Sequence, residues 1–533
     1  MSKINSITIV GGGSSGWMTA AAICKQLPNI KLTLIESPTI PTIGVGESTI
    51  GHINEFLHFL GLTDSDWMKA CNATYKTSIK FIDFRENPGK DPHVFHYPFG
   101  IFDYTNKPRG LMEWFAIKAT IPNIDEYSFS TFYHDSVMMT DANKMTKNED
   151  ISIRGFNFEL DTAYHMDATL FGNYLRDIIC LPSNMSHILD MVTYVNLDET
   201  GSISKIITEN SGELLADLYI DCTGFKSLLL EETLKVPFIS FHDTLLNDSA
   251  VAAVIPYVDI EKEMECVTSC TAIEAGWIWN IPLWDRIGTG YVYSSKYATE
   301  KEAEEQFLKH LSSSRMVCQD TDRLKDLKLR HIKIKHGVHE RAWEKNVIGI
   351  GLANGFIEPL ESTGLMLTHE CIIKVVNILK NRNGTVTKFD IDSFNFAFRE
   401  QIVGFKDFIS LHYALTMRND TPYWKKVSEN TTYSQKMYDF EPSLSNGYTD
   451  LAYKNIRSRH YGGDMSGIVY IAAGMGYNPL DSSRVEFLNK RYNEDVDASL
   501  TALNEWEKHK VEVLKVIDKL PTHYQFLKDT IYD

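Results

Sequence analysis

ITIVGGGSSGW, residues 7–17, joins a short apolar run to a glycine-rich turn. The run is mostly β-branched and stops at glycine, which predicts a buried parallel strand. Gly11, Gly13 and Gly16 follow in GxGxxG spacing, which permits a tight turn and lets a pyrophosphate approach the backbone closely. This stretch therefore predicts the start of a dinucleotide-binding α/β fold.

The residues after the turn complete a βαβ unit. Residues 17–26 predict a helix, and residues 31–35 predict a second strand that ends at Glu36. The helix N-terminus would face the pyrophosphate, and Glu36 is placed to accept the ribose hydroxyls. The glycines alone would also fit a plain α/β turn, but strand, helix and terminal acid together favour dinucleotide binding.

Two later strands favour FAD over NAD. ADLYIDCTGFKSLL (216–229) and KNVIGIGLANGFIEPLESTGL (345–365) each run from a strand into a glycine-containing turn. Several strand ends that return to one cofactor suit an extended FAD better than a self-contained NAD module. The sequence holds no second GxGxxG with its own βαβ unit, so no NADPH module is evident.

The apolar pattern becomes helical from about residue 375. We therefore expect an α/β, FAD-binding fold of the glutathione-reductase/hydroxylase type over residues 1–375, with substrate-side insertions at about 85–160. Residues 376–533 should form a mainly helical cap or substrate domain.

The composition disfavours several classes of partner. The 53 Lys and Arg against 70 Asp and Glu give a net charge of −17, which repels nucleic acids and anionic membranes. The eight Cys form no CxxC pair, so we expect neither a metal site nor a disulfide framework. The first apolar run stops too early for a signal peptide or membrane span, which favours the cytoplasm. The oligomeric state, including a homo-oligomer, stays open.

A second helix start follows Glu361. Ser362 and Thr363 are natural cap residues, and the run after Gly364 is apolar and compatible with a helix. The backbone N–H groups and the dipole at such a start can hold a small anion. The alternative is a simple capped helix, in which Glu361 merely complements the dipole.

CNATYKTSIKFIDF (71–84) predicts a strand that carries Lys76 and Lys80 on the same side. On this pattern alone, each lysine is read as a solvated surface charge.

The sequence resembles the flavin-dependent halogenases of the tryptophan halogenase family. The resemblance rests on motifs that span the chain to about residue 425. They are GGGSSGW (11–17), IGVGEST (43–49), AYHMDA (163–168), DLYIDCTGF (217–225), WxWxIP (Trp277, Trp279, Ile281, Pro282), EPLESTG (358–364) and HYALTMRND (412–420).

The resemblance implies that reduced FAD, oxygen and a halide ion yield hypohalous acid. It places the halide at Thr363 and Gly364, in agreement with the anion site read from the residues. Lys76 would deliver the electrophilic halogen to an aromatic ring, Glu361 would position the oxidant and accept the ring proton, and Ser362 would hydrogen-bond beside it. A separate NAD(P)H-dependent flavin reductase would supply the reduced FAD.

The resemblance also assigns the remaining site residues. The WxWxIP strand would form a rigid wall between substrate and flavin. The loop at 45–47 would couple the flavin and substrate sites. The expected cofactor-binding residues are Gly11, Gly13, Gly16, Trp17, Glu36, Val45, Gly46 and Glu47.

The sequence departs from the family pattern around the substrate. In FHYPFG (95–100) Phe99 is retained, but Tyr97 stands where a histidine is expected. Ile468 stands where a tryptophan is expected, so free tryptophan is not the expected substrate. His96, Tyr97, Phe99 and Tyr470 could line an aromatic pocket or belong to the core. We expect a small electron-rich aromatic of the indole or phenol type.

Two other functions remain open at this point. A flavin-dependent aromatic monooxygenase would use the same cofactor, and halide dependence of product formation separates it from a halogenase. A non-catalytic flavin-binding redox protein would turn over no substrate.

Overall fold

The computed structural model divides into two compact units, each built from three segments of the chain. The first comprises residues 1–73, 164–243 and 334–405, and the second comprises residues 74–163, 244–333 and 406–533. The segments of the two units alternate along the chain. The structure describes residues 3–39, 44, 46–100, 124, 127–147, 151, 153–313, 316–430, 466–476 and 493–533.

The first unit is organised by a six-stranded sheet of order β20-β21-β12-β1-β2-β8. Its strands are β1 (Ser6–Val10), β2 (Lys31–Glu36), β8 (Ser186–Leu189), β12 (Leu218–Asp221), β20 (Trp343–Glu344) and β21 (Val347–Gly349). All neighbours are parallel except β20 and β21. The predicted βαβ unit is present, and its helix α1 (Ser14–Gln26) begins three residues before the expected start at Trp17.

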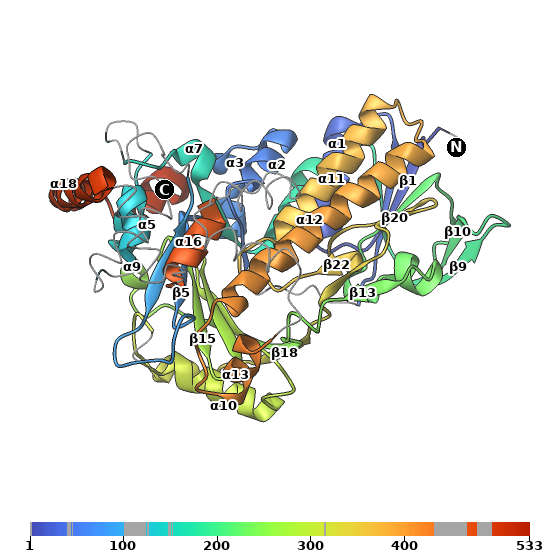
Figure 1. Cartoon of the computed structure of the whole chain (residues 1–533). Helices are drawn as coiled ribbons and strands as arrows, with labels where there is room; N and C mark the ends of the chain where they lie inside the picture. The colour runs from blue at the N-terminus through green and yellow to red at the C-terminus, as the bar shows by residue number, and fades with distance from the viewer. Residues whose placement is uncertain are drawn as a thin grey trace. The chain divides into compact units, whose positions relative to one another are not determined.

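Helices and smaller sheets complete the first unit. The helices are α2 (Ile53–Leu60), α3 (Asp64–Trp67), α8 (Ala168–Tyr174) and α11 (Gly364–Asn381). The shorter strands are β3 (Glu47–Ser48), β7 (Ala163–Met166), β9 (Val192–Leu197), β10 (Ile203–Thr208), β11 (Glu213–Leu214), β13 (Phe238–Ser240), β19 (Gly337–His339) and β22 (Gly355–Phe356). Helices α1 and α11 pack together (Figure 1).

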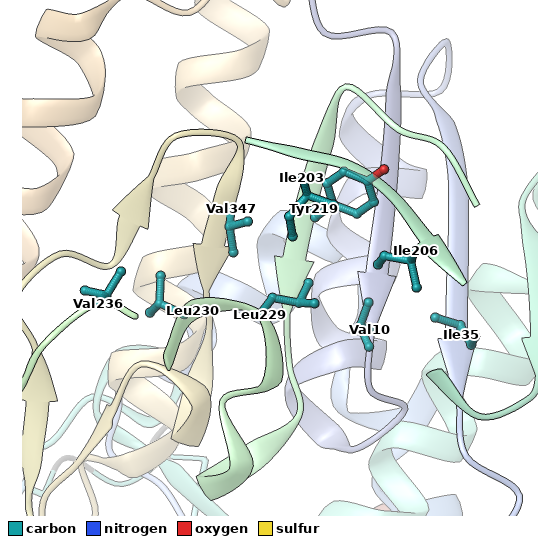
Figure 2. Packing of buried hydrophobic residues seen from close by; sticks show 9 residues of the cluster. All are labelled: Val10, Ile35, Ile203, Ile206, Tyr219, Leu229, Leu230, Val236 and Val347. Carbon is teal, nitrogen blue, oxygen red and sulfur yellow. The ribbon is translucent and has the colours of Figure 1, made fainter. Parts of the chain in front are cut away.

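The core of the first unit includes apolar side chains on the parallel strands. Val10, Tyr219 and Val347 come from three neighbouring strands and pack against Ile206 of the small sheet β11-β10-β9 (Figure 2). The continuous β-branched runs that predict buried strands therefore supply this cluster.

The second unit is organised by a seven-stranded sheet of order β18-β14-β17-β16-β15-β5-β6. Its strands are β5 (Ser78–Ile82), β6 (Val94–Pro98), β14 (Ser249–Ile255), β15 (Val267–Ile273), β16 (Gly276–Pro282), β17 (Ile287–Tyr293) and β18 (Arg330–Lys333). Neighbours are antiparallel except β15 and β5. The short strand β4 (Thr74–Lys76) precedes β5.

Helices supply the rest of the second unit. They are α5 (Tyr127–Tyr133), α6 (Asp135–Asp141), α7 (Phe158–Asp161), α9 (Ile260–Glu263), α10 (Glu300–Leu311), α13 (Pro422–Ser428), α16 (Ser466–Gly474), α18 (Asn493–Ile517) and α19 (His523–Leu527), and α12 (Lys388–Ala414) begins in the first unit and ends in the second. The expected C-terminal helices are present. Every helix in the described ranges is too short or too polar to cross a membrane.

Candidate active site

The glycine turn after β1 leaves no room for side chains. Gly11 has φ +110°, and a Cβ atom there would lie 2.3 Å from the carbonyl oxygen of Cys222. A Cβ atom on Gly16 would lie 1.9 Å from the carbonyl oxygen of Gly11. Gly13 precedes α1 and offers no side-chain cap. The first N–H groups of α1 are therefore available to an anionic group, as the GxGxxG spacing predicts.

Glu36 lies against this turn, where the sequence predicts a ribose acceptor. A Cβ atom on Gly12 would lie 1.5 Å from Oε2 of Glu36. Oε1 of Glu36 lies 2.8 Å from Nε2 of His187, whose ring packs edge-on against Trp17 at 5.0 Å. The sequence analysis missed His187, because only the pairing of β8 beside β2 brings it to Glu36.

The loop that contains Gly46 and Glu47 approaches the turn before α11. Ser48 follows Glu47 on β3, and its Oγ lies 3.0 Å from Oγ of Ser362. Burial raises the pKa of Glu47 to about 7. Gly46 is buried at φ +90°, and Val45 lies outside the described residues.

The start of α11 combines buried polar groups with open space. Glu361, Ser362 and Thr363 are each at most 2% exposed. Thr363 stands at the N-cap of α11, as its residue type predicts, but its side chain makes no cap bond, and Ser362 before it has φ +57°. The Thr363 hydroxyl has no hydrogen-bond partner within the described residues. A Cβ atom on Gly364 would meet nothing within 4 Å.

Lys76, in the second unit, is fully buried at the end of β4. Its Nζ lies 4.9 Å from the centroid of the Phe99 ring. The strand is held on both sides, because Thr74 donates to the carbonyl oxygen of Pro282 at 2.6 Å and the Tyr75 N–H donates to Nε2 of His523 at 3.2 Å. The reading of Lys76 as a solvated charge is therefore wrong.

Lys80 does not share a continuous strand with Lys76, because β4 ends at Lys76 and β5 begins at Ser78. Lys80 is half-buried and forms an ion pair of 2.6 Å with Glu265. Burial opposes its charge, but the carboxylates of Glu265 and Asp141 hold the pKa of Lys80 above its usual value. Lys80 is thus a structural ion-pair partner rather than a surface charge.

His96 and Tyr97 point to opposite faces of β6, as consecutive strand residues must. Nδ1 of His96 lies 2.9 Å from Oγ of Ser78, and its Nε2 lies 3.2 Å from Oδ1 of Asp141. The structure thus separates His96 from Tyr97 and Phe99 and buries it, which agrees with the alternative that His96 belongs to the core.

Tyr97 and Phe99 belong to a group of packed rings, the aromatic cluster, which comprises Tyr97, Phe99, Phe129, Phe408 and Tyr470. The Tyr97 ring lies 6.0 Å from Phe99, 6.3 Å from Phe408 and 6.0 Å from Tyr470, with Tyr470 stacked at 24°. Tyr470, on α16, also contacts Phe129 at 5.4 Å. The side chain of Ile468 lies outside the described residues. Tyr97, Phe99 and Tyr470, which are predicted to line the substrate pocket, therefore belong to the same unit as Lys76.

The WxWxIP strand is β16, which forms the middle of the large sheet. Trp277 and Trp279 meet edge to face at 6.3 Å, and Trp277 is fully buried. The Trp279 ring covers Gly290 on β17, where a Cβ atom would lie 2.2 Å from it. Ile281 and Pro282 are buried as well.

Comparisons with known proteins agree on one family. The family model for tryptophan halogenases matches residues 6–451. The tryptophan 6-halogenase ThaL of Streptomyces albogriseolus is 35% identical over 440 residues, which cover 80% of this chain and 79% of ThaL. The apo structure of VirX1 matches with a TM-score of 0.89 and 44% identity, over 100% of this chain and 99% of VirX1. Tar14, a tryptophan C-6 flavin-dependent halogenase (chlorinase) from taromycin biosynthesis, matches with a TM-score of 0.83 and 34% identity, over 98% of this chain and 99% of its own.

Proposed function

The chain belongs to the tryptophan halogenase family, and from this premise we propose that it uses reduced FAD, oxygen and a halide ion to halogenate an indole- or phenol-type ring at Lys76. Membership confirms the enzyme class predicted from the sequence, a flavin-dependent halogenase. The observation that carries the proposed site is the complete burial of Lys76 against Phe99. A lysine is rarely buried unless a partner or a reaction requires it.

The first unit fits FAD. The uncapped start of α1 offers N–H groups to the pyrophosphate, the glycines at 11 and 16 exclude side chains from it, and Glu36 offers an acceptor to the ribose. These features support an FAD-binding fold of the glutathione-reductase/hydroxylase type. Reduced FAD, when bound, supplies the two electrons with which oxygen and halide become hypohalous acid. A separate NAD(P)H-dependent flavin reductase would provide it, because the sequence holds a single GxGxxG unit.

The start of α11 fits a halide ion. Thr363 offers a buried hydroxyl that has no partner among the described residues, Gly364 leaves open space, and the helix dipole favours negative charge there. The neighbouring carboxylate of Glu361 is buried on the other side of Ser362. We therefore assign Thr363 and Gly364 as halide ligands.

Lys76 and Glu361 carry the chemistry of transfer. The Lys76 ammonium donates a hydrogen bond to hypohalous acid, or its amine carries the halogen, and so directs the electrophile toward the ring. The ring carbon gains the halogen and loses its proton to the Glu361 carboxylate, while the hydroxide of hypohalous acid takes a proton from the Lys76 ammonium and leaves as water. Proton exchange with solvent then returns Glu361 to the carboxylate and Lys76 to the ammonium. Ser362 holds Glu361 in place through the backbone turn.

The aromatic cluster supports a flat aromatic substrate. Tyr97, Phe99 and Tyr470 pack together in the same unit as Lys76, and aromatic side chains of this kind stack on electron-rich rings. The Trp277–Trp279 wall would keep the substrate away from the flavin.

A halide-dependence experiment tests this function. The purified protein would be supplied with FAD, an unrelated flavin reductase, NADH and oxygen, and offered simple indoles and phenols with chloride, bromide or iodide. We expect halogenated product only when halide is present, detected by mass spectrometry. A hydroxylated product that is independent of halide would instead identify a monooxygenase, and flavin binding without any product would identify a redox protein.

A further inference from the structure

His134 is a buried polar residue that the reaction above does not use. It stands between α5 and α6 and has no exposed surface. Its Nδ1 lies 3.0 Å from the carbonyl oxygen of Gly155. A carbonyl oxygen can only accept, so Nδ1 carries the proton and Nε2 carries a lone pair. Burial lowers the pKa of His134 to about 4, so the ring is neutral at neutral pH.

Nε2 of His134 is left without a hydrogen-bond partner in the described ranges of the chain. Most buried polar side-chain atoms have a partner, and one that lacks it loses the hydrogen bond that water gives it in the unfolded chain. An acceptor that is buried and neutral is suited to a ligand that brings its own N–H or O–H group.

Two independent sets of contacts tie His134 to the aromatic cluster. The His134 ring packs edge to face on Tyr470 at 5.5 Å, and Tyr470 stacks on Tyr97. On the other side, a Cβ atom on Gly100 would lie 2.0 Å from the carbonyl oxygen of Gly155, the group that His134 bonds. Gly100 directly follows Phe99, whose ring lies beneath the Lys76 ammonium. The His134 ring therefore borders the rings proposed to hold the substrate.

We propose that Nε2 of His134 accepts a hydrogen bond from the ring N–H or O–H group of the aromatic substrate, which makes His134 a specificity-determining residue. This inference rests on the proposed halogenation of an indole- or phenol-type ring. A hydrogen bond at one edge of the ring would fix its orientation in the aromatic cluster, where stacking alone leaves a flat ring free to rotate. A substrate without a donor would leave the acceptor unsatisfied and bind more weakly.

Isomeric probe pairs isolate the donor. 3-Methylindole and 1-methylindole are isomers in which the methyl group stands on a ring carbon or replaces the hydrogen of the ring nitrogen, and 4-methylphenol and anisole differ likewise at the hydroxyl. Calorimetric binding of each probe to the full chain, without flavin or halide, measures the preference independently of turnover. In at least one pair, we expect the wild-type protein to bind the isomer with the N–H or O–H group about tenfold more tightly than the isomer without it. This ratio corresponds to one hydrogen bond.

Two variants test whether His134 is the acceptor. His134→Asn keeps a side-chain N–H near the position of Nδ1 for Gly155 but removes Nε2, and should reduce the preference to within about twofold. His134→Gln places an amide near the position of Nε2 and should retain part of it. Thermal unfolding shows whether each variant is folded.

The inference is overturned if the wild-type protein shows no donor preference in either pair, if it binds none of the four probes, or if His134→Asn keeps the full preference. Failure of the proposed function has a different signature, namely a donor preference that depends on His134 in a protein that forms no halogenated product. The two outcomes are therefore distinguishable in one set of measurements.

Discussion

The side-chain oxygens of Ser48 and Ser362 lie 3.0 Å apart and join the loop after Gly46 to the turn before α11. Ser362 has φ +57°, a left-handed conformation that costs a non-glycine residue about 1–3 kcal/mol. Glu361 and Thr363 flank it, so the position of a proposed acid–base group and that of a proposed halide ligand depend on one strained residue. The hydrogen bond between Ser48 and Ser362 supports this strained turn.

Ser48→Ala should therefore loosen the turn. We expect the free energy of unfolding to fall by about 1 kcal/mol, the usual loss for a buried hydrogen bond, and the halogenation rate to fall with it. Ser362→Gly provides the matched comparison, because it removes the same bond but also the cost of the left-handed conformation. Chemical denaturation of both variants measures the difference. If Ser48→Ala and the wild-type protein have the same free energy of unfolding, the hydrogen bond between Ser48 and Ser362 does not stabilise the turn.

Gly364→Val should occupy the open space at the start of α11. The backbone there needs no positive φ, so the variant should fold, yet its side chain would compete with the halide. We expect the halide concentration for half-maximal rate to rise about tenfold or more, while FAD affinity, measured by fluorescence titration, stays unchanged. Gly89→Ala is the control, because a Cβ atom there meets only the Asp91 carbonyl oxygen at 3.6 Å. An unchanged halide requirement in folded Gly364→Val would show that the halide does not bind at the start of α11.

Local features of the site were readable from the sequence, and long-range ones were not. The glycines at 11 and 16 and Glu36 are fixed by the geometry of a single βαβ unit, so spacing alone predicts them. The pairing of Lys80 with Glu265 joins residues 185 positions apart through the parallel contact of β5 and β15. No local pattern encodes which strands become neighbours.

Two residues of the site show where a local pattern stops being informative. His96 and Tyr97 are adjacent in the sequence, whereas the pleat of β6 sends them to opposite faces. Thr363 occupies the N-cap position of α11, as its residue type predicts, but its hydroxyl accepts no N–H of that helix. Residue type states what a side chain can do, and only the surrounding fold decides which option it takes.

Lys76→Met should abolish halogenation while the protein still consumes reduced FAD. Methionine keeps the apolar stem above Phe99 and removes the amine, so hypohalite should escape and react with a soluble halogen trap. Lys80→Met should keep the halogenation activity but lower stability by about 1–3 kcal/mol, because Glu265 loses its partner in a half-buried setting. Adding Glu265→Gln to Lys80→Met should recover part of that loss. Full product formation by Lys76→Met would show that halogenation does not require Lys76.

His523 should make the strand that carries Lys76 sensitive to acid. Its Nδ1 donates to the carbonyl oxygen of Met264 at 3.0 Å and its Nε2 accepts the Tyr75 N–H, an arrangement that only the neutral ring can make. Burial lowers the pKa of His523 from 6.5 to about 4. The folded state binds this proton less readily than the unfolded state, so the stabilisation is fully present above about pH 6.5 and is lost as the pH falls toward about 4.

We expect the contribution of His523 to the free energy of unfolding to fall by about 2 kcal/mol between neutral pH and about pH 5. His523→Gln can still accept the Tyr75 N–H without titrating, and should show a correspondingly flatter pH dependence. Denaturation midpoints at several pH values provide the measurement. Parallel pH profiles of the two proteins would exclude His523 as the source.

Gly290→Ala should displace the aromatic wall. The Trp279 ring occupies the position that the new methyl group needs, so one of the two must move, and overpacking of this kind costs about 1–3 kcal/mol. If the wall separates substrate from flavin, displacement of the ring should lower the yield of halogenated product and raise that of hydroxylated product, both measured by mass spectrometry. Trp279→Phe in the same chain should recover part of the stability, because the smaller ring leaves room for the methyl group, whereas Gly89→Ala should change neither quantity. A Gly290→Ala protein as stable as Gly89→Ala, with an unchanged product ratio, would show that the Trp279 ring moves freely and that the wall does not control access to the flavin.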